Sequence, residues 1–415
     1  MADIVLTTFD GIREALYSRD LTRSLDDRSF DEGNPRAGVL SMLHGDEHKE
    51  RRRLENPLFR RAELVEYEQE LFPVAIDAIA ARDAVGRVDL LELTGTMATV
   101  LACRRAGIDH DGSRAQLTDL FRIGLALAQG AAVADALVDQ DAVRRETEAT
   151  LERLEERYVG PSRRARQELV DRSRDGADVT LPYDLITAAL LSRGSGAQSL
   201  DDALLTREVG LYLHGGSHTS AQTTCNAFEF LLGLDGTDRG ALMAEAASST
   251  LAAQRIVHET LRVVPMTPRV QRRAVTDTVV AGHRVPAGAT IVLDVRSGNR
   301  DERYFGPEPD RFDPHRPVGV GASKWGLSFG AGPHICIGRS VAGGIPLQGA
   351  EEADALGDGH LYGQVARMVQ AIAARGVRPD PSRAPERDDR TTRSSARWRT
   401  FPVVFPATDD ETTAS

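Results

Sequence analysis

Cysteine, lysine and long apolar runs are scarce in this chain of 415 residues, and each shortage narrows what the protein can be. The three cysteines stand far apart, which argues against a disulfide framework and for a reducing compartment. Lysine occurs only twice, and the formal net charge of -11 argues against a nucleic-acid partner. No stretch approaches the roughly 20 uncharged apolar residues of a membrane span, and the N-terminal residues resemble no signal peptide. We therefore expect a cytoplasmic protein without a membrane or nucleic-acid partner.

Helical periodicity dominates the chain from about Asp46 to Arg262. Before it, the pattern predicts a strand at Ile4–Thr7 and a helix capped by Asp10. After it, the stretch "TVVAGHRVPAGATIVLDV" predicts a hairpin, and "TFPVVF" predicts a last strand. This order predicts a mainly α fold with minor β parts, in a single domain over residues 1–406 followed by a disordered tail at 407–415.

The stretch "FGAGPHICIG" (329–338) holds three glycines, a proline and one cysteine, Cys336, just before a predicted helix. Glycine allows a backbone to approach a ligand closely, and the N-terminal amides of a following helix favour thiolate over thiol. Zinc would need more cysteine or histidine ligands nearby, whereas haem iron accepts one axial thiolate. Cys103 and Cys225 lack such a setting, and we expect them to be small buried apolar side chains.

This stretch resembles the haem loop of the cytochrome P450 family, with Phe329, Gly332, His334, Cys336 and Gly338 at the expected spacing. The resemblance covers nearly the whole chain, from about residue 3 to residue 405. It implies a cytochrome P450 fold and haem b as cofactor, with Cys336 as the axial ligand of the iron. It also implies that Phe329 and the glycines shield the sulfur and that His334 contacts the haem.

Two further stretches resemble the family's buried charge cluster. "HETLR" places Glu259 and Arg262 three residues apart on one helical face, and "PDRF" supplies Arg311 as the third member. Alone, a glutamate–arginine pair at this spacing is usually a surface salt bridge. In this order before the thiolate loop, the resemblance implies a structural cluster.

The haem propionates need charge-assisted donors, because a buried carboxylate must be paired. "HKERR" places His48 and Arg52 four apart on one helix, and the resemblance gives both the role of binding a propionate. "QRRAVTDTVV" supplies another propionate arginine, best aligned at Arg272, with Arg273 as the alternative. The other basic residues of "HKERR" and its neighbour are expected to form a solvated face: Lys49, Arg51 and Arg53.

The sequence also departs from the family pattern. His48 lies closer to the N-terminus than is usual, and the family's first helix and first strand are not found. A glycine-rich, acidic insertion of unassigned role, at 343–359, follows Cys336. In "GGSHTS", Gly215, Gly216 and Thr219 match the oxygen-activation motif, but His218 replaces the usual acid.

The resemblance implies a monooxygenase that hydroxylates or epoxidises a small organic substrate in secondary metabolism, with Thr219 in proton delivery. Three hypotheses stay open for His218: a substitute proton relay, a side chain turned away from the haem, or recognition of a carboxylate or hydroxyl of the substrate. Electrons would come from a ferredoxin and its reductase, since no GxGxxG motif for a flavin or nicotinamide cofactor follows a strand. His218 keeps a second hypothesis open, an enzyme that couples, desaturates or rearranges its substrate without net oxygen insertion. A third, a non-catalytic haem-binding protein, would need neither Thr219 nor a substrate-binding helix.

Overall fold

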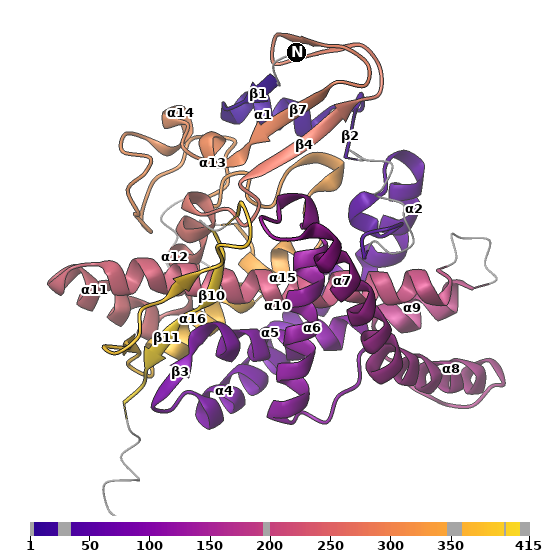
Figure 1. Ribbon diagram of the computed structural model, residues 1–415. Coiled ribbons are helices and arrows are strands. Elements are labelled where there is room, and N and C mark those ends of the chain that lie inside the picture. Colours follow the sequence, from indigo (N-terminus) through magenta and orange to yellow (C-terminus); the bar gives the residue numbers. More distant parts are fainter. Residues whose placement is uncertain (1–3, 24–34, 194–199, 347–358, 394–395, 407–415) are drawn as a thin grey trace, which may run out of the picture. The chain divides into compact units, whose positions relative to one another are not determined.

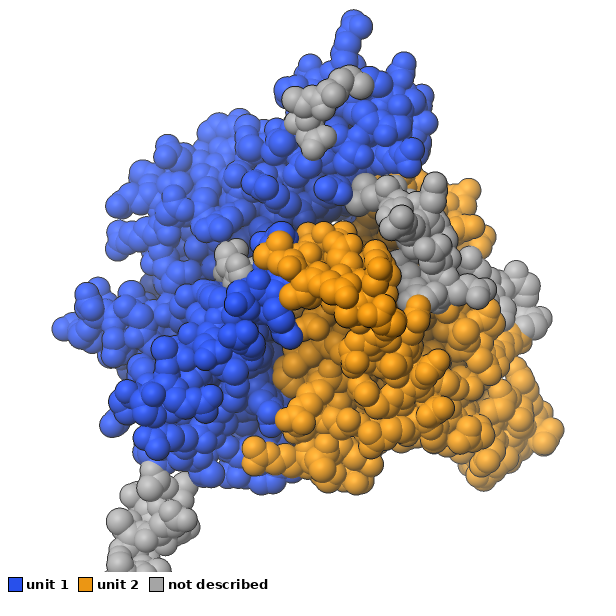
Figure 2. Space-filling view, viewed as in Figure 1, with its two compact units in different colours: residues 1–21, 64–97, 219–415 blue, residues 22–63, 98–218 orange. Residues whose placement is uncertain are grey.

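The computed structural model describes residues 4–23, 35–193, 200–346, 359–393 and 396–406 (Figure 1). The tail predicted at 407–415 and residues 347–358 of the predicted insertion lie outside the described residues. The chain forms two compact units, coloured separately in Figure 2: unit 1 comprises residues 1–21, 64–97 and 219–415, and unit 2 comprises residues 22–63 and 98–218. The single domain over residues 1–406 stays a prediction.

Unit 1 contains the small sheets and the helices that precede and follow them. Its helical elements are η4 (Tyr67–Leu71), α4 (Phe72–Asp83), α11 (Gly236–Ser248), α12 (Thr250–Val263), α13 (Val295–Gly298), α14 (Glu302–Phe305), η7 (Gly332–His334), α15 (Arg339–Gly343), α16 (Gln364–Ala373) and, at its start, α1 (Phe9–Tyr17). Its strands are β1 (Ile4–Leu6), β3 (Arg87–Asp89), β4 (Arg269–Ala274), β5 (Thr278–Val280), β6 (His283–Val285), β7 (Thr290–Asp294), β8 (Arg378–Pro379), β9 (Glu386–Arg387), β10 (Trp398–Thr400) and β11 (Pro402–Val404). Helix α12 packs against α11 and α16, and α16 packs against α4.

The regular elements that lie wholly within unit 2 are helices over its described residues. Its elements are η2 (Leu40–Met42), α2 (Gly45–Glu55), η3 (Asn56–Phe59), α6 (Arg114–Gly130), η5 (Val133–Asp135), α7 (Gln140–Leu154), η6 (Glu155–Val159), α8 (Gly160–Arg174) and α9 (Leu185–Ser192). Four elements continue from one unit into the other: β2 (Leu21–Thr22), α3 (Arg61–Glu66), α5 (Leu90–Ala106) and α10 (Asp202–Gly233). The core of unit 2 gathers apolar side chains such as Leu120, Ile186 and Leu213 from α6, α9 and α10.

The main sheet of unit 1 is built on β7, which pairs in parallel with β1 and antiparallel with β4 (Figure 1). Apolar side chains on alternate positions of β7, Ile291 and Leu293, belong to one core cluster with Phe9, Ile12 and Leu16 of α1. The predicted hairpin is present as β5 and β6, which pair antiparallel. The mainly α architecture with small sheets is the fold class that the sequence predicts.

Helix α1 begins two residues earlier than predicted, at Phe9. Its N-cap is Thr8, whose hydroxyl accepts a hydrogen bond from the Gly11 N–H at 3.3 Å. Asp10 lies in the first turn and pairs with Arg13 at 2.9 Å, so it supports the helix without capping it. The prediction of an Asp10 cap was therefore wrong, because Thr8 is the residue in the extended conformation that a cap requires.

After Cys336 the chain makes a short helix, α15, and then leaves it at Gly344. It returns at Gly363, the N-cap of α16. The two ends of the intervening segment meet, since the Ile345 N–H donates to the Leu361 carbonyl oxygen at 2.8 Å. Both glycines have left-handed φ angles, +76° and +87°, and a Cβ on Gly363 would lie 2.5 Å from the Gly344 nitrogen. The segment therefore starts and ends at one point of unit 1.

A buried charge cluster lies beside α12. Glu259 and Arg262 form a bidentate pair, with N–O distances of 2.7 Å for both hydrogen bonds, and Arg262 is fully buried. Arg316, also buried, donates from Nε to Glu259 at 3.3 Å. The Asp313 N–H donates to the same carboxylate at 3.0 Å. Carbonyl oxygens take the remaining Arg262 donors, those of Asn299 and Pro309 among them.

The third arginine of this cluster is Arg316, which corrects the assignment of Arg311. The Arg311 side chain is exposed and pairs with Glu308 at 3.7 Å. Its carbonyl oxygen is what faces the cluster, where it accepts from Arg316 at 2.7 Å. The reason is local, since residues 308–311 form a turn that directs the Arg311 side chain outward.

We expect Glu259→Ala to lower the free energy of unfolding by about 3–5 kcal/mol, because it leaves two buried guanidinium groups without their carboxylate. Arg311→Ala is the matched control, and its effect should stay within about 0.5 kcal/mol. Urea unfolding monitored by circular dichroism measures both. Equal losses for the two variants would contradict the assignment of Arg316 and Arg311.

Candidate functional site

The loop from Phe329 to Gly338 is closed by its own backbone. The Cys336 N–H donates to the Phe329 carbonyl oxygen at 2.9 Å, and the Cys336 carbonyl oxygen accepts from Arg339 Nη1 at 3.1 Å. Gly330 and Gly332 have φ angles of +70° and +67°, a region that other residues rarely adopt. The glycines are therefore what lets the chain turn tightly enough to present Cys336.

Aromatic rings support this loop from within unit 1. The Phe329 ring meets the Trp325 ring edge-on, with centroids 4.9 Å apart, and Trp325 meets His258 in the same way at 4.8 Å. A Cβ on Gly343 of α15 would lie 3.1 Å from the Phe329 ring, so this glycine lets α15 pack directly on the ring. His258 also contacts Gly343, since its Nε2 lies 2.8 Å from the Gly343 carbonyl oxygen.

Cys336 is the accessible thiol among the three cysteines. Its residue is exposed, whereas Cys103 and Cys225 are fully buried, as predicted for both. Burial raises the pKa of the Cys103 and Cys225 thiols well above their usual range, so neither is a source of thiolate. A Cβ on Gly338, two residues after Cys336, would meet no atom within 4 Å. The thiol is thus presented at an open position in the loop.

The two arginines that are candidates for a propionate contact point to opposite faces of strand β4. Arg272 is buried, at 5% exposure, and Arg273 is exposed, because successive strand residues point to opposite faces. Arg272 also donates from Nη1 to the Gln271 carbonyl oxygen at 2.8 Å. His334 lies half-buried at the end of η7. The geometry of unit 1 therefore favours Arg272 over Arg273 as an inward-facing donor.

In unit 2, His48 and Arg52 lie one turn apart on α2. His48 is buried, and Arg52 is half-buried. Burial, and secondly the charge of Arg52, lower the pKa of His48 to about 4. At neutral pH His48 is therefore an uncharged imidazole with one N–H to donate.

Arg51, on the same helix, was expected on a solvated face, and that prediction was wrong. It is buried, at 1% exposure, and forms an ion pair with Glu208 of α10. Lys49 and Arg53 are exposed, as expected, and Lys49 pairs with Asp46 at 2.7 Å. The signal that sequence reasoning missed is Glu208 itself, a carboxylate within the otherwise apolar run "EVGLYL".

Helix α10 crosses its neighbours in unit 2 closely through small residues. A Cβ on Gly216 would lie 3.1 Å from the Ala102 Cβ of α5, and a Cβ on Gly124 of α6 would lie 3.1 Å from Ser217 Oγ. The Ser217 hydroxyl turns back to donate to the Leu213 carbonyl oxygen at 2.7 Å. This side of α10 is therefore closed by packing.

The other side of α10 is open. Gly215 is exposed and Thr219 is half-buried, and the two lie one turn apart on the same face. The Thr219 carbonyl oxygen accepts a hydrogen bond from Thr223 at 2.8 Å. His218 is buried, at 4% exposure, so it does not face solvent. The unit boundary falls between His218 and Thr219, within this one helix.

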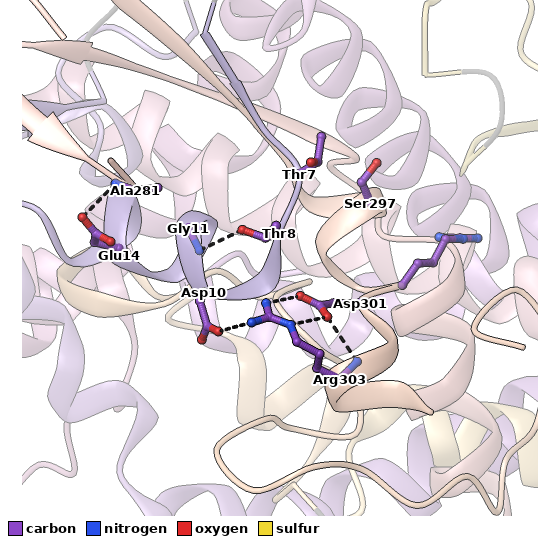
Figure 3. A pocket seen from close by; sticks show the side chains of 10 residues that line it. Thr7, Thr8, Asp10, Gly11, Glu14, Ala281, Ser297, Asp301 and Arg303 are labelled. Carbon is purple, nitrogen blue, oxygen red and sulfur yellow. Dashed lines mark hydrogen bonds and ion pairs between the residues drawn. The ribbon is translucent and has the colours of Figure 1, made fainter. Parts of the chain in front are cut away.

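A surface hollow of ≈ 540 Å³ in unit 1 contains none of the predicted site residues (Figure 3). Arg303 lies across the hollow and forms ion pairs with Asp301 at 2.6 Å and with Asp10 at 3.3 Å. The charge of Arg303 is therefore paired with those of the two aspartates. Glu14 at its edge accepts a hydrogen bond from the Ala281 N–H at 2.9 Å. These contacts hold α1 in place rather than form a catalytic group.

The donor set fits a haem. In unit 1, one exposed cysteine in a glycine loop matches a single axial thiolate, and Arg272 and His334 supply donors for carboxylates. In unit 2, His48 and Arg52 are donors of the same kind. Over the described ranges, no three histidine, cysteine, aspartate or glutamate side chains gather as a metal site would require. Nor does any helix in the described residues combine the length and apolar character needed to cross a membrane.

Comparisons with known proteins give matches to one family. The family model described as "Cytochrome P450" matches residues 244–343. Cyclooctat-9-en-7-ol 5-monooxygenase from Streptomyces melanosporofaciens is 28% identical over 333 residues, which cover 73% of this chain and 68% of that protein. Cyclomarin C epoxidase CymV from Salinispora arenicola is 34% identical over 166 residues, which cover 39% of this chain and 38% of that protein.

Solved structures show the same fold. CalO2 matches with a TM-score of 0.70 and 19% identity, covering 97% of this chain and 90% of that chain. The open cytochrome P450 EryK from S. erythraea matches with a TM-score of 0.66 and 21% identity, covering 98% and 91%. The matched family model and these relatives are cytochrome P450 proteins, and members of that family are haem-thiolate enzymes with iron.

We predict that Arg272→Gln speeds haem loss to excess apomyoglobin roughly 10- to 100-fold, because a hydrogen bond to a charged group is worth about 1.5–3 kcal/mol. Arg273→Gln, on the exposed face of the same strand, should change the rate less than about twofold. The reverse order of the two variants would assign the propionate contact to Arg273.

Proposed function

We propose that this cytochrome P450 inserts oxygen into a small organic substrate, by hydroxylation or epoxidation, with electrons from a separate ferredoxin and its reductase. The observation that carries the proposal is the exposed Cys336 thiol in the glycine loop, whose Phe329 ring packs edge-on against Trp325. The relatives named as a monooxygenase and an epoxidase support oxygen insertion. A separate electron donor is proposed because the chain has no dinucleotide-binding fingerprint of its own.

Each proposed role uses a property of the side chain in this structure. The Cys336 sulfur would bind the iron, and bound haem supplies the oxygen chemistry. Arg272 and His334 in unit 1, and His48 and Arg52 in unit 2, would pair with the two propionates. Gly215 leaves room beside Thr219, whose hydroxyl would hold a proton donor or a water next to the bound oxygen.

His218 supports a second candidate, oxidative coupling, desaturation or rearrangement without net oxygen insertion. Its place beside Thr219 is where the family pattern has an acid, and it is buried rather than turned to solvent. An imidazole both accepts and donates protons near neutral pH, so it could relay a proton to Thr219. It could instead bind a carboxylate or hydroxyl of the substrate. Products formed under ¹⁸O₂ decide between the two reactions, since oxygen insertion incorporates the label.

The haem assignment predicts a red-shifted Soret band for the reduced, carbon monoxide-bound protein, and its loss in Cys336→Ser. Cys103→Ala, which removes a buried thiol, should keep the band. Pyridine haemochrome titration confirms that the wild-type protein and Cys103→Ala carry equal amounts of haem. A globin-like band in the wild-type protein would refute thiolate ligation.

The relay hypothesis predicts that His218→Ala uncouples electron consumption into peroxide and slows product formation by roughly 10²–10⁴-fold, the usual contribution of a general acid. His218→Glu should restore coupling. The substrate for the assay is one that shifts the Soret band on binding, so that affinity and turnover are measured separately. Rates and coupling that match the wild-type protein in both variants would remove His218 from proton delivery. Weaker substrate binding with coupling intact would assign it to recognition.

A further inference from the structure

Four buried side chains of unit 2 connect α2 to α10. Arg51 of α2 pairs with Glu208 of α10, and the Tyr212 hydroxyl of α10 donates to Glu55 Oε2 at 2.9 Å. Exposure is 1% for Arg51, 0% for both carboxylic residues and 9% for Tyr212. The Leu40 N–H adds a third contact, donating to the two Glu208 oxygens at 3.2 and 3.0 Å.

The spacing explains why these contacts fix the helices. Arg51 and Glu55 are four residues apart on α2, and Glu208 and Tyr212 are four apart on α10, so each pair lies on one face of its helix. Two contacts, one turn apart, prevent both rotation and sliding of α2 along α10. Near the end of α2, Arg105 of α5 donates to the Leu58 carbonyl oxygen, which holds the chain that follows Glu55.

The charges of this cluster balance if one carboxyl is neutral, since it contains two carboxyls and one guanidinium. Burial raises the pKa of both carboxyls, that of Glu208 to about 7. Arg51 and the Leu40 N–H lower the pKa of Glu208, whereas the Glu208 charge further raises that of Glu55. Glu55 is therefore the carboxyl that stays protonated.

The remaining charged groups near the pair do not change this assignment. Arg52 and Arg51 lower the pKa of Glu55, but burial and the Glu208 charge are the larger effects. Arg207 lowers the pKa of Glu208, which favours ionisation there. Burial raises the pKa of Tyr212 well above its usual range, so its phenol stays neutral despite Arg105. Arg51 Nε and Nη2 have no hydrogen-bond partner among the described residues, so this guanidinium depends on Glu208.

We propose that Arg51, Glu55, Glu208 and Tyr212 are positioning residues that set how α2 presents His48 and Arg52 to the haem propionates. The row of His48 and Arg52 lies next to the row of Arg51 and Glu55, so a turn of α2 would move both rows together. The positioning role rests on the proposed function of His48 and Arg52. It goes beyond that function because these four side chains contact one another between α2 and α10.

The test measures haem loss from the holoprotein to excess apomyoglobin between pH 6.5 and 9. Tyr212→Phe keeps the ring but leaves Glu55 Oε2 without its donor, and haem loss at pH 7 should rise about tenfold, as for other residues that orient a ligand through a second group. Glu55→Gln keeps a neutral group that can still bind Tyr212, and its rate at pH 7 should stay within about twofold of the wild-type rate. Arg53→Gln, on the exposed face of α2, is the matched control and should leave the rate unchanged.

The pH profile separates positioning from simple stabilisation. Rising pH favours the ionised form of both carboxyls, Glu208 before Glu55, and the repulsion between them should loosen α2 and speed haem loss in the wild-type protein. Glu55→Gln has no such proton to lose, so the ratio of wild-type to variant rates should grow with pH. The free energy of unfolding follows the same sign, because a carboxyl whose pKa is raised on folding stabilises the folded state at low pH and less as pH rises.

Hydrogen exchange of residues 45–55 in the apoprotein tests the connection without haem. Faster exchange is expected in Tyr212→Phe and not in Arg53→Gln. Unchanged haem loss in Tyr212→Phe, or identical pH profiles for the wild-type protein and Glu55→Gln, would overturn the positioning role while leaving the haem assignment intact. A wild-type protein without the thiolate spectrum would instead overturn the proposed function, and the positioning role with it. If Tyr212→Phe does not fold, the comparison with Glu55→Gln still decides.

Discussion

A guanidinium that is taken out of water must be met by carboxylate and carbonyl oxygens, and this requirement organises each unit of the chain. In unit 1, Arg262 is fully buried and binds Glu259 with two hydrogen bonds and backbone carbonyls with the rest. In unit 2, Arg51 is buried against Glu208. The first cluster anchors the irregular segment before the Cys336 loop, and the second anchors the helix of His48. The groups proposed to hold haem are thus placed by charges that do not touch it.

The choice of arginine over lysine follows from this role. A guanidinium offers five donors in a fixed plane, so it can bind a carboxylate with two of them and carbonyls with the others. Arg262 does this, and Arg316 makes one contact to Glu259 and others to the carbonyl oxygens of Phe305 and Arg311. One of the two lysines, Lys324, serves the same region and donates to the Arg316 carbonyl oxygen at 2.7 Å. A chain rich in arginine can therefore order loops that have little regular structure.

Sequence reasoning succeeded where local geometry alone decides the outcome. A helix places residues three apart on one face, so Glu259 and Arg262 meet, and the glycine spacing of the Cys336 loop predicts its turns. It chose Arg311 instead of Arg316 as the third member of the charge cluster, because in an irregular segment the spacing of residues does not fix where a side chain points. It could not choose between Arg272 and Arg273 because strand register decides which one points inward, and register depends on pairing with β7. The burial of Arg51 could not be predicted without knowing that Glu208 of α10 lies opposite it.

The same electrostatic requirement bears on the histidine beside Thr219. A carboxylate that is buried as His218 is would need its own guanidinium or would lose its charge, as Glu55 does beside Glu208. A neutral imidazole needs no counter-ion, so it can be buried within the close packing of α10 that Gly216 and Ser217 create. Helix α10 has a fully buried carboxylate ten residues earlier, at Glu208, where Arg51 neutralises it. A histidine at position 218 can therefore be buried without a counter-ion, where a carboxylate could not keep its charge.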